Sequence, residues 1–317
     1  MSDRGSGQFA VRRGTRRFLG GAFGLACLAA TLTGVVVLAI LLGSVLHQAR
    51  RRPRPDGGLG APMAIGALPG HLLDLASKRS SSDPTRSGFK VGIYGSLWLL
   101  GLVAAFSIPV GVGAAVYLEE FAPAGRLRRA IQVNIANLAG VPSIVYGILG
   151  LAVFVRAFGA ERLALGKTLW AGALTLGLLV LPVIVIATQE ALRAVPPSLR
   201  QAALALGATR WQVVRDHVLP SSLAGILTGT ILALSRAIGE TAPLLLVGAA
   251  GSILVVPKGP SSFYTALPVE IYNDARDPSP AFQSVAAGGI LVLLVLLLSM
   301  NAAAILIRHR HARQPRA

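Results

Sequence analysis

Long uncharged stretches constrain the fold of this chain more than any other feature of its sequence. Five of them lack charged side chains, at residues 18–49, 91–118, 130–155, 168–189 and 278–307. Each is long enough to cross roughly 30 Å of hydrocarbon as an α-helix. A sixth apolar stretch, from Ser221 to Val247, has a similar length but carries Arg236 and Glu240 in its middle. The pattern predicts an all-α integral membrane protein with six transmembrane helices.

Composition and charge argue against a soluble protein and against a nucleic-acid-binding protein. Of the 317 residues, 53% are hydrophobic and 14% are charged, so a soluble fold could not enclose these stretches and keep a polar surface. A formal net charge of +17 would suggest nucleic-acid binding in a soluble chain. Here Lys and Arg flank the apolar stretches, where such residues set orientation and contact anionic lipid. The single cysteine, Cys27, excludes an internal disulfide and a cysteine-based metal site.

The N-terminus has a charge pattern that invites comparison with a secretory signal. Arginines up to Arg17 precede the first apolar stretch. That stretch is about twice as long as a signal core, and no small-residue cleavage site follows it. We expect an uncleaved transmembrane helix at 18–48, preceded by a basic cytoplasmic tail at 1–17.

The remaining boundaries follow from the polar connections. A membrane core is expected over 91–307, with helices at about 91–118, 131–155, 168–190, 221–247 and 281–307. Residues 49–90 are expected to form a flexible extracytoplasmic loop, because their Arg/Pro/Gly-rich start and Ser-Ser-Ser-Asp-Pro centre are typical of linkers. Residues 308–317 are expected to form a second basic cytoplasmic tail.

The distribution of basic residues favours cytoplasmic termini. With six helices, the side that holds both termini carries 16 Lys and Arg residues and the other side carries 13, and cytoplasmic loops are enriched in both. Four arginines directly after the first helix run against this rule: Arg50, Arg51, Arg52 and Arg54. Long loops cross the membrane largely regardless of charge, so we keep the orientation with both termini in the cytoplasm.

The connection between the fourth and fifth helices carries strong local signals. Pro197 suits the first turn of a helix, and Gly207 suits the C-cap that ends it. The run Thr209-Arg210-Trp211-Gln212 has the form of a capping box that opens a second short helix, and Pro220 then starts the next membrane helix. We expect two short cytoplasmic helices within 197–218, a shape suited to docking into a cleft of another protein.

This connection resembles the coupling signature of ABC importer permeases. It reads Gln201-Ala202-Ala203, then Gly207, then His217-Val218-Leu219-Pro220. Gln201 replaces the family's glutamate and His217 its usual isoleucine, so the resemblance implies the docking shape without the salt bridge that the glutamate could make. The resemblance implies that six residues couple the chain to the ATPase: Gln201, Ala202, Ala203, Gly207, Leu219 and Pro220.

Four further stretches resemble the A-type permease subunit of phosphate-specific transporters. They begin at Val116, Val133, Ser235 and Thr265 and read VYLEEFAP, VNIANLAGVPSIVYG, SRAIGETAP and TALPVEIY. The likeness covers roughly residues 91–275. It implies the type I importer permease fold (MetI-like), inorganic phosphate as the substrate, transport by alternating access, and a place in the cytoplasmic (inner) membrane of the cell.

The resemblance also implies a set of partners. They are a second homologous permease subunit, two copies of an ATP-binding subunit, an extracytoplasmic phosphate-binding protein and membrane lipid, with no nucleic acid. Gly166-Lys167-Thr168 looks like the end of a phosphate-binding loop, but Glu161 stands where the motif needs glycine. The chain is therefore expected to be no enzyme and to lack its own nucleotide site. The histidines lack zinc-ligand spacing, and no cofactor or metal is expected.

Arg236 and Glu240 are the main candidates for the substrate path. They lie four residues apart, on one face of the helix, and ionisable groups inside a membrane usually face a cavity or a partner. The arginine fork matches phosphate oxygens, and Glu240 could accept a hydrogen bond from the proton that phosphate keeps and sulfate lacks. The alternative is that the two charges only neutralise each other. A neighbouring stripe of small residues lets another helix pack closely: Gly225, Gly229, Ala233 and Ala237.

Five more polar residues complete the predicted path. One follows Glu240, and the others lie on the third helix around Gly140 and Pro142: Thr241, Asn134, Asn137, Ser143 and Tyr146. A proline within a membrane helix frees a backbone carbonyl, and amide side chains either line a polar path or hold helices together. For the residues of the third helix, packing is the alternative role.

Three other functions compete with phosphate transport as interpretations of the sequence. A permease for another oxyanion, sulfate or molybdate, or for a polar organic solute would share the coupling signature but would need no Arg236–Glu240 pair. An intramembrane enzyme would need a nucleophile with a base, or clustered metal ligands, at membrane depth, and the sequence offers no such set. A regulatory membrane partner also fits, since importers can report the supply of their substrate.

Overall fold

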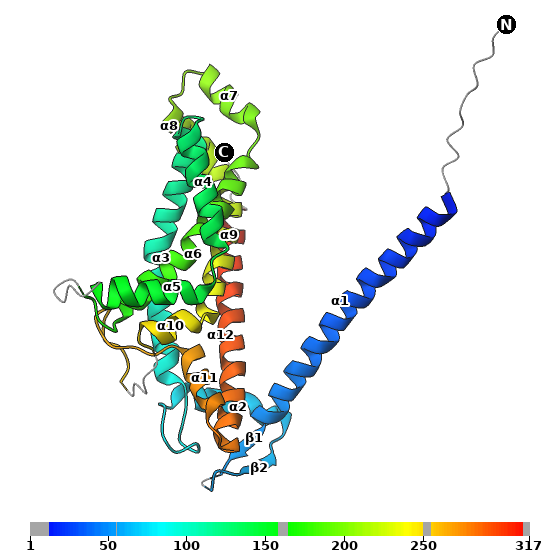
Figure 1. The fold of residues 1–317 in the computed structure, drawn as a ribbon, viewed down its shortest axis with the longest axis vertical. Helices are drawn as coiled ribbons and strands as arrows, with labels where there is room; N and C mark the ends of the chain where they lie inside the picture. Colours follow the sequence, from blue (N-terminus) through cyan, green and yellow to red (C-terminus); the bar gives the residue numbers. More distant parts are fainter. Residues whose placement is uncertain (1–12, 55, 158–163, 250–254, 313–317) are drawn as a thin grey trace. The chain divides into compact units, whose positions relative to one another are not determined.

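The computed structural model describes residues 13–54, 56–157, 164–249 and 255–312, and helices dominate these residues (Figure 1). Five helices are long and apolar enough to cross a membrane, and a bent helix pair raises the number to six. Chain contacts divide the protein into two units, Met1–His47 and Gln48–Ala317. The prediction of an all-α membrane protein with six spans is confirmed for the part of the chain that is described.

Helix α1 (Arg13–Ala49) contains the span expected at 18–48. The side chains of residues 21–44 are exposed, and most of them are apolar. A helix of this length that is hydrophobic on all sides is suited to a lipid environment.

The connection after α1 is folded, in contrast to the flexible loop expected at 49–90. Strands β1 (Arg51–Pro53) and β2 (Leu59–Pro62) form an antiparallel hairpin, followed by the 3-10 turn η1 (Ile65–Ala67) and helix α2 (Leu68–Ser77). The physical reason lies in buried apolar side chains, which linker composition does not reveal. Leu75 and Phe89 lie in an apolar cluster with residues of the last two helices, α11 (Leu267–Arg276) and α12 (Pro280–Ala312).

Helix α6 (Leu169–Arg193) lies at the centre of the membrane bundle and packs against α3 (Lys90–Val116) and α9 (Leu219–Gly239). The stripe of small residues on α9 makes the α6 contact possible. A Cβ atom added at Gly229 would lie 2.3 Å from Cβ of Ala187, and one added at Gly225 would lie 2.8 Å from Cβ of Ala191. The expectation that another helix packs on this stripe is therefore confirmed.

The third predicted span is bent rather than straight. Helix α4 (Arg126–Ala139) and the segment formed by α5 (Ser143–Gly150) and the π-helical turn η3 (Leu151–Val155) meet at 101°. Pro142 explains the difference from the helix expected at 131–155, because its ring lacks an N–H and would clash with the carbonyl of Leu138 in a continuous helix. The Tyr146 hydroxyl donates to that carbonyl over 2.9 Å and ties α5 to α4.

The fifth predicted span, expected at 221–247, is interrupted. Helix α9 ends at Gly239, Glu240 has an extended backbone, and the short helix α10 covers Ala242–Val247. Pro243 accounts for the break, since in an unbroken helix its ring would meet the carbonyl of Gly239. Arg236 and Glu240 thus lie at a helix end and not in the middle of a span.

The start of α9 also differs from the prediction. The second cytoplasmic helix, expected to end near Val218, instead runs into the membrane helix without a break from Arg210 to Gly239. Helix α8 (Arg210–Gln212) continues through the π-helical turn η6 (Val213–Val218) into α9. The π turn shifts the hydrogen-bond pairing by one residue, which lets the helix pass Pro220 and its missing N–H.

The buried carboxyl of Glu270 on α11 should make the free energy of unfolding depend on pH. Oε2 accepts a hydrogen bond from the Gly92 N–H over 3.2 Å, while Oε1 is buried and has no hydrogen-bond partner among the described residues. Burial, followed by the charge of Asp274, raises the pKa of Glu270 to about 8 from an ordinary value of 4.5. The stability that the neutral acid contributes is therefore complete below about pH 4.5 and is lost as the pH rises through about 8.

Replacing Glu270 with glutamine should narrow the difference in melting temperature between pH 5 and pH 9, measured on the purified chain in detergent. Most of the effect should appear at pH 9, where the wild-type carboxylate is charged. The exposed Glu190→Gln is the matched control and should keep the wild-type difference. An unchanged pH dependence in Glu270→Gln would show that the pKa of this carboxyl is the same in the folded and the unfolded chain.

Candidate functional site

The short helices between α6 and α9 lie at one end of the bundle (Figure 1). Helix α7 covers Pro197–Ala205, Gly207 turns the chain with φ +85°, and α8 follows. The capping box is confirmed, with the Gln212 N–H donating to Thr209 Oγ1 over 3.3 Å and the Thr209 N–H donating to Gln212 Oε1 over 2.8 Å. We call residues 197–218 the coupling segment.

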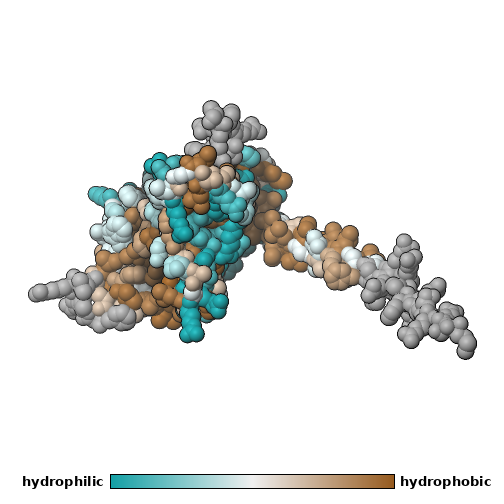
Figure 2. Space-filling view, turned by 90° about the horizontal axis from the view of Figure 1, so that it is seen from above, coloured by the Kyte–Doolittle hydropathy of each residue, from teal (hydrophilic) through white to brown (hydrophobic). Residues whose placement is uncertain are grey.

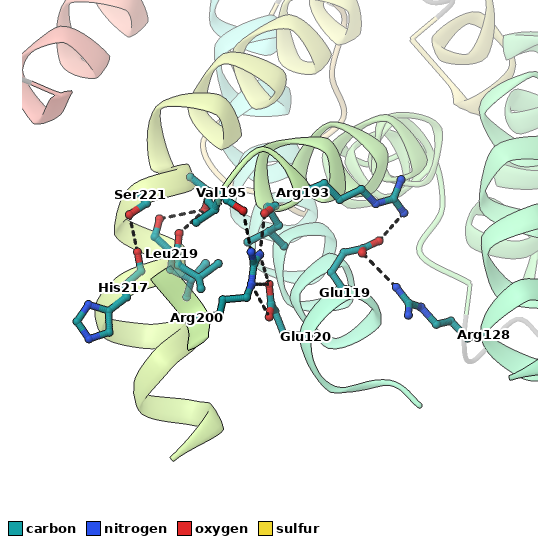
Figure 3. A network of polar contacts seen from close by, with 12 residues as sticks. Glu119, Glu120, Arg128, Arg193, Val195, Arg200, His217, Leu219 and Ser221 are labelled. Atoms are coloured by element: carbon teal, nitrogen blue, oxygen red, sulfur yellow. Dashed lines mark hydrogen bonds and ion pairs between the residues drawn. The ribbon is translucent and has the colours of Figure 1, made fainter. Parts of the chain in front are cut away.

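Two glutamates at the end of α3 connect the coupling segment to the membrane bundle (Figure 3). Glu119 and Glu120 lie in the π-helical turn η2 (Tyr117–Phe121), and their side chains are only 10% and 11% exposed. Glu120 receives hydrogen bonds from Nε and Nη2 of Arg200 on α7, the shorter over 2.8 Å. Glu119 binds Arg128 on α4 over 3.1 Å and Arg193 at the end of α6 over 2.5 Å.

Arg200 has further partners besides Glu120. Its guanidinium donates to the carbonyls of Leu192 and Val195 over 2.8 Å each, and these carbonyls belong to the last turn of α6 and the residues after it. A planar guanidinium can satisfy a carboxylate and two carbonyls at once. The ends of α3 and α6 are thereby fixed to α7 by one side chain.

Sequence reasoning did not assign this network. Three of these residues were only counted among the basic residues of the sequence: Arg128, Arg193 and Arg200. Glu119 and Glu120 appeared only within the VYLEEFAP stretch that resembles phosphate permeases. A signal was present, since two adjacent acids directly after an apolar span need partners unless they face water. Their partners come from three other elements, and sequence spacing does not reveal such long-range contacts.

The coupling segment also presents apolar side chains next to its turn. Leu206 is 90% exposed and Trp211 is 54% exposed. Among the predicted coupling residues, Gln201 and Ala202 are exposed, whereas Ala203 packs against Val213 and Val214 beneath the surface. Figure 2 looks onto this end and shows hydrophilic residues gathered over the bundle, with hydrophobic residues along its flanks.

Arg236 and Glu240 contact each other at the break between α9 and α10. Nε of Arg236 lies 3.3 Å from Oε1 of Glu240, and the side chains are 52% and 18% exposed. Among the described residues, neither terminal nitrogen of Arg236 nor Oε2 of Glu240 has a hydrogen-bond partner. The pair therefore neutralises charge in part and still offers an arginine fork to an anion.

No hydrogen bond or ion pair among the described residues joins the other predicted path residues to this pair. Asn134 bonds the Ala130 carbonyl of its own helix over 2.9 Å, and the exposed Asn137 has no side-chain bond to a described residue. The Tyr146 hydroxyl stabilises the bend between α4 and α5, which supports the packing role for that residue.

Helix α5, which also carries the half-buried Ser143, packs closely against α10. A Cβ atom added at Gly147 on α5 would lie 2.7 Å from Cα of Pro243 on α10. The half-buried Thr241 lies between α9 and α10.

The comparisons with known proteins agree on one kind of protein. Residues 107–311 match the family described as "Binding-protein-dependent transport system inner membrane component". The Phosphate transport system permease protein PstA 1 of Mycobacterium tuberculosis (strain H37Rv) is 38% identical over 226 residues, covering 71% of this chain and 70% of that protein. The Probable ABC transporter permease protein YqgI of Bacillus subtilis (strain 168) is 32% identical over 263 residues, covering 78% and 86%.

A solved structure supports the fold. A chain of a bacterial alginate ABC transporter, crystallised in complex with an alginate-bound periplasmic protein, superposes with a TM-score of 0.60. The match covers 95% of this chain and 97% of that chain at 17% sequence identity. At this identity the likeness concerns the fold.

Proposed function

The chain belongs to the family of binding-protein-dependent transport system inner membrane components, and from that membership we propose that it is the permease subunit of an ATP-driven importer of inorganic phosphate. It is a multi-pass membrane protein and a transport subunit rather than an enzyme, energised by a separate ATPase. The assignment of phosphate as the substrate rests on the 38% identity with a phosphate transport permease over 71% of the chain. Sulfate and molybdate are not favoured by these relatives.

The proposed complex contains four other kinds of component. They are a second homologous permease, two copies of an ATP-binding subunit, an extracytoplasmic phosphate-binding protein and the surrounding lipid. The coupling segment supplies the ATPase contact, with Leu206 and Trp211 as its apolar anchors. Both termini are placed in the cytoplasm, and the C-terminal end of α12 lies at the same end of the bundle as the coupling segment (Figure 1).

The mechanism follows from how the coupling segment is held. When the ATPases close, they move α7, and Arg200 transmits that movement to the ends of α3 and α6 through Glu120 and two carbonyls. Glu119 extends the connection to α4 through Arg128. The bent α4–α5 unit and the broken α9–α10 unit provide the joints at which the path can open alternately to each side.

Uptake of labelled phosphate tests this function. In cells that lack this chain and other phosphate importers, expression of the chain with its partners should restore uptake, and a tenfold excess of sulfate should not compete. Equal competition by sulfate, or uptake that does not depend on this chain, would contradict the proposal.

Glu240 is proposed to select phosphate over sulfate. Its Oε2 atom can accept a hydrogen bond from the proton that phosphate retains near neutral pH, and sulfate has no such proton. Glu240→Gln should therefore reduce phosphate uptake and increase competition by sulfate, because the amide can donate to either anion. The exposed Glu190→Gln is the matched control. Unchanged sulfate rejection in Glu240→Gln would remove this role.

A further inference from the structure

A polar cavity lies at the end of the bundle opposite the coupling segment, among segments that the transport proposal does not use. It has a volume of about 440 Å³ and is bordered by β1, α2 and the segment before α3. Figure 1 shows β1 and α2 at this end. Cavities of roughly 300–1,000 Å³ are typical of small-molecule sites.

The cavity has a basic lining. Arg52 comes from β1, His71 comes from α2, and Lys78 directly follows α2. Lys78 is held by Asp74, with Nζ 2.6 Å from Oδ2. The side chains of Arg52 and His71 make no hydrogen bond or ion pair with any residue in the described ranges. The charge left uncompensated is therefore positive.

We propose that this cavity binds a phosphate group, held by the guanidinium of Arg52 and the imidazole of His71. Arg52 can offer two parallel N–H donors to two phosphate oxygens, which is the geometry that arginine provides for oxyanions. The phosphate group can belong to free inorganic phosphate or to the headgroup of an anionic phospholipid, because both present the same oxygens. The hydroxyl of Thr85 also borders the cavity but is engaged by Asp83 over 2.7 Å.

The pKa of His71 should change when the cavity holds a phosphate group. Burial, followed by the positive charge of Arg52, lowers the pKa of His71 from 6.5. Lys78, directly after α2, acts in the same direction, while Asp74 opposes it. An anion placed between Arg52 and His71 would favour the imidazolium and raise this pKa. Binding should accordingly strengthen as the pH falls and His71 becomes protonated.

The test measures the pKa of His71 from the hydrogen exchange rate of its imidazole carbon by mass spectrometry. The full chain is kept in maltoside micelles at constant ionic strength. One arm contains no phosphate, one contains inorganic phosphate, and one contains phosphatidylglycerol. We expect at least one of the two ligands to raise the pKa of His71 by about one pH unit.

Three variants decide whether the cavity is responsible. Arg52→Gln should abolish the response, and Arg52→Lys should retain part of it. Arg86→Gln removes a charge from the same connection but outside the cavity, and it should respond as the wild type does.

Each outcome bears on the proposal. A response to inorganic phosphate identifies the free ion, and a response to phosphatidylglycerol alone identifies a lipid site. No response to either ligand, or an Arg52→Gln variant that responds like Arg86→Gln, would overturn the proposal. Because the measurement needs no transport, it is independent of the proposed function.

Discussion

Arg200→Gln is expected to reduce ATP-driven phosphate uptake by at least about tenfold while leaving the chain in the membrane. The substitution removes the ion pair with Glu120 and the hydrogen bonds to two carbonyls at the end of α6. Hydrogen bonds to charged groups contribute about 1.5–3 kcal/mol each. The loss should therefore detach α7 from α3 and α6, so that ATP hydrolysis continues without matching transport. Uptake and ATPase activity, measured together in proteoliposomes, report the number of phosphate ions moved per ATP.

The matched control for Arg200 lies in the same coupling segment. Arg215 pairs with its neighbour Asp216 on the surface, where both side chains are largely exposed, and exposed pairs contribute roughly 0–1 kcal/mol. Arg215→Gln should keep both uptake and coupling. Glu120→Gln should weaken coupling less than Arg200→Gln, because Arg200 retains its carbonyl contacts. Normal coupling in Arg200→Gln would show that movement reaches the membrane bundle by another route.

Arg236→Gln is expected to reduce phosphate uptake by about 10- to 100-fold, with ATPase docking intact. The variant loses a charged fork whose terminal nitrogens have no partner among the described residues. Loss of charge-assisted hydrogen bonds of about 1.5–3 kcal/mol corresponds to that range. Arg236→Lys keeps the charge without the fork, so its phosphate uptake should lie between that of the wild type and that of Arg236→Gln. Labelled phosphate uptake, corrected for the amount of assembled transporter, gives the comparison.

A double variant separates substrate contact from simple charge neutralisation. If Arg236 and Glu240 only neutralise each other across 3.3 Å, then Arg236→Gln/Glu240→Gln should restore uptake, since no unpaired charge remains. If Arg236 attracts the anion, the double variant should transport no better than Arg236→Gln. Full recovery in the double variant would remove Arg236 from the substrate path.

The sequence predicted those parts of the structure that depend on local patterns. The apolar stretches gave the spans, and Thr209 with Gln212 gave the capping box, because these signals lie within a few residues of one another. The family implied by Gln201-Ala202-Ala203 and Gly207 is confirmed by the match over residues 107–311. The packing of Gly225 and Gly229 on another helix was also predictable, although its partner α6 was not.

The parts that were missed depend on contacts between distant residues or on the effect of proline. Pro142 and Pro243 each prevent a continuous helix, so two spans expected to be straight are bent or broken. The fold of the first loop depends on Leu75, whose partners on α11 and α12 lie far along the chain. The Glu119–Glu120 network draws on three separate helices, and no spacing rule connects them.

Reconstitution of the purified transporter in proteoliposomes, with the binding protein outside and ATP inside, tests phosphate transport directly. We expect labelled phosphate to accumulate only with ATP and this chain. Excess sulfate should not reduce the accumulation, and Arg236→Gln should reduce it sharply. Accumulation of sulfate or another solute in place of phosphate, or undiminished phosphate transport by Arg236→Gln, would contradict the proposed phosphate transport.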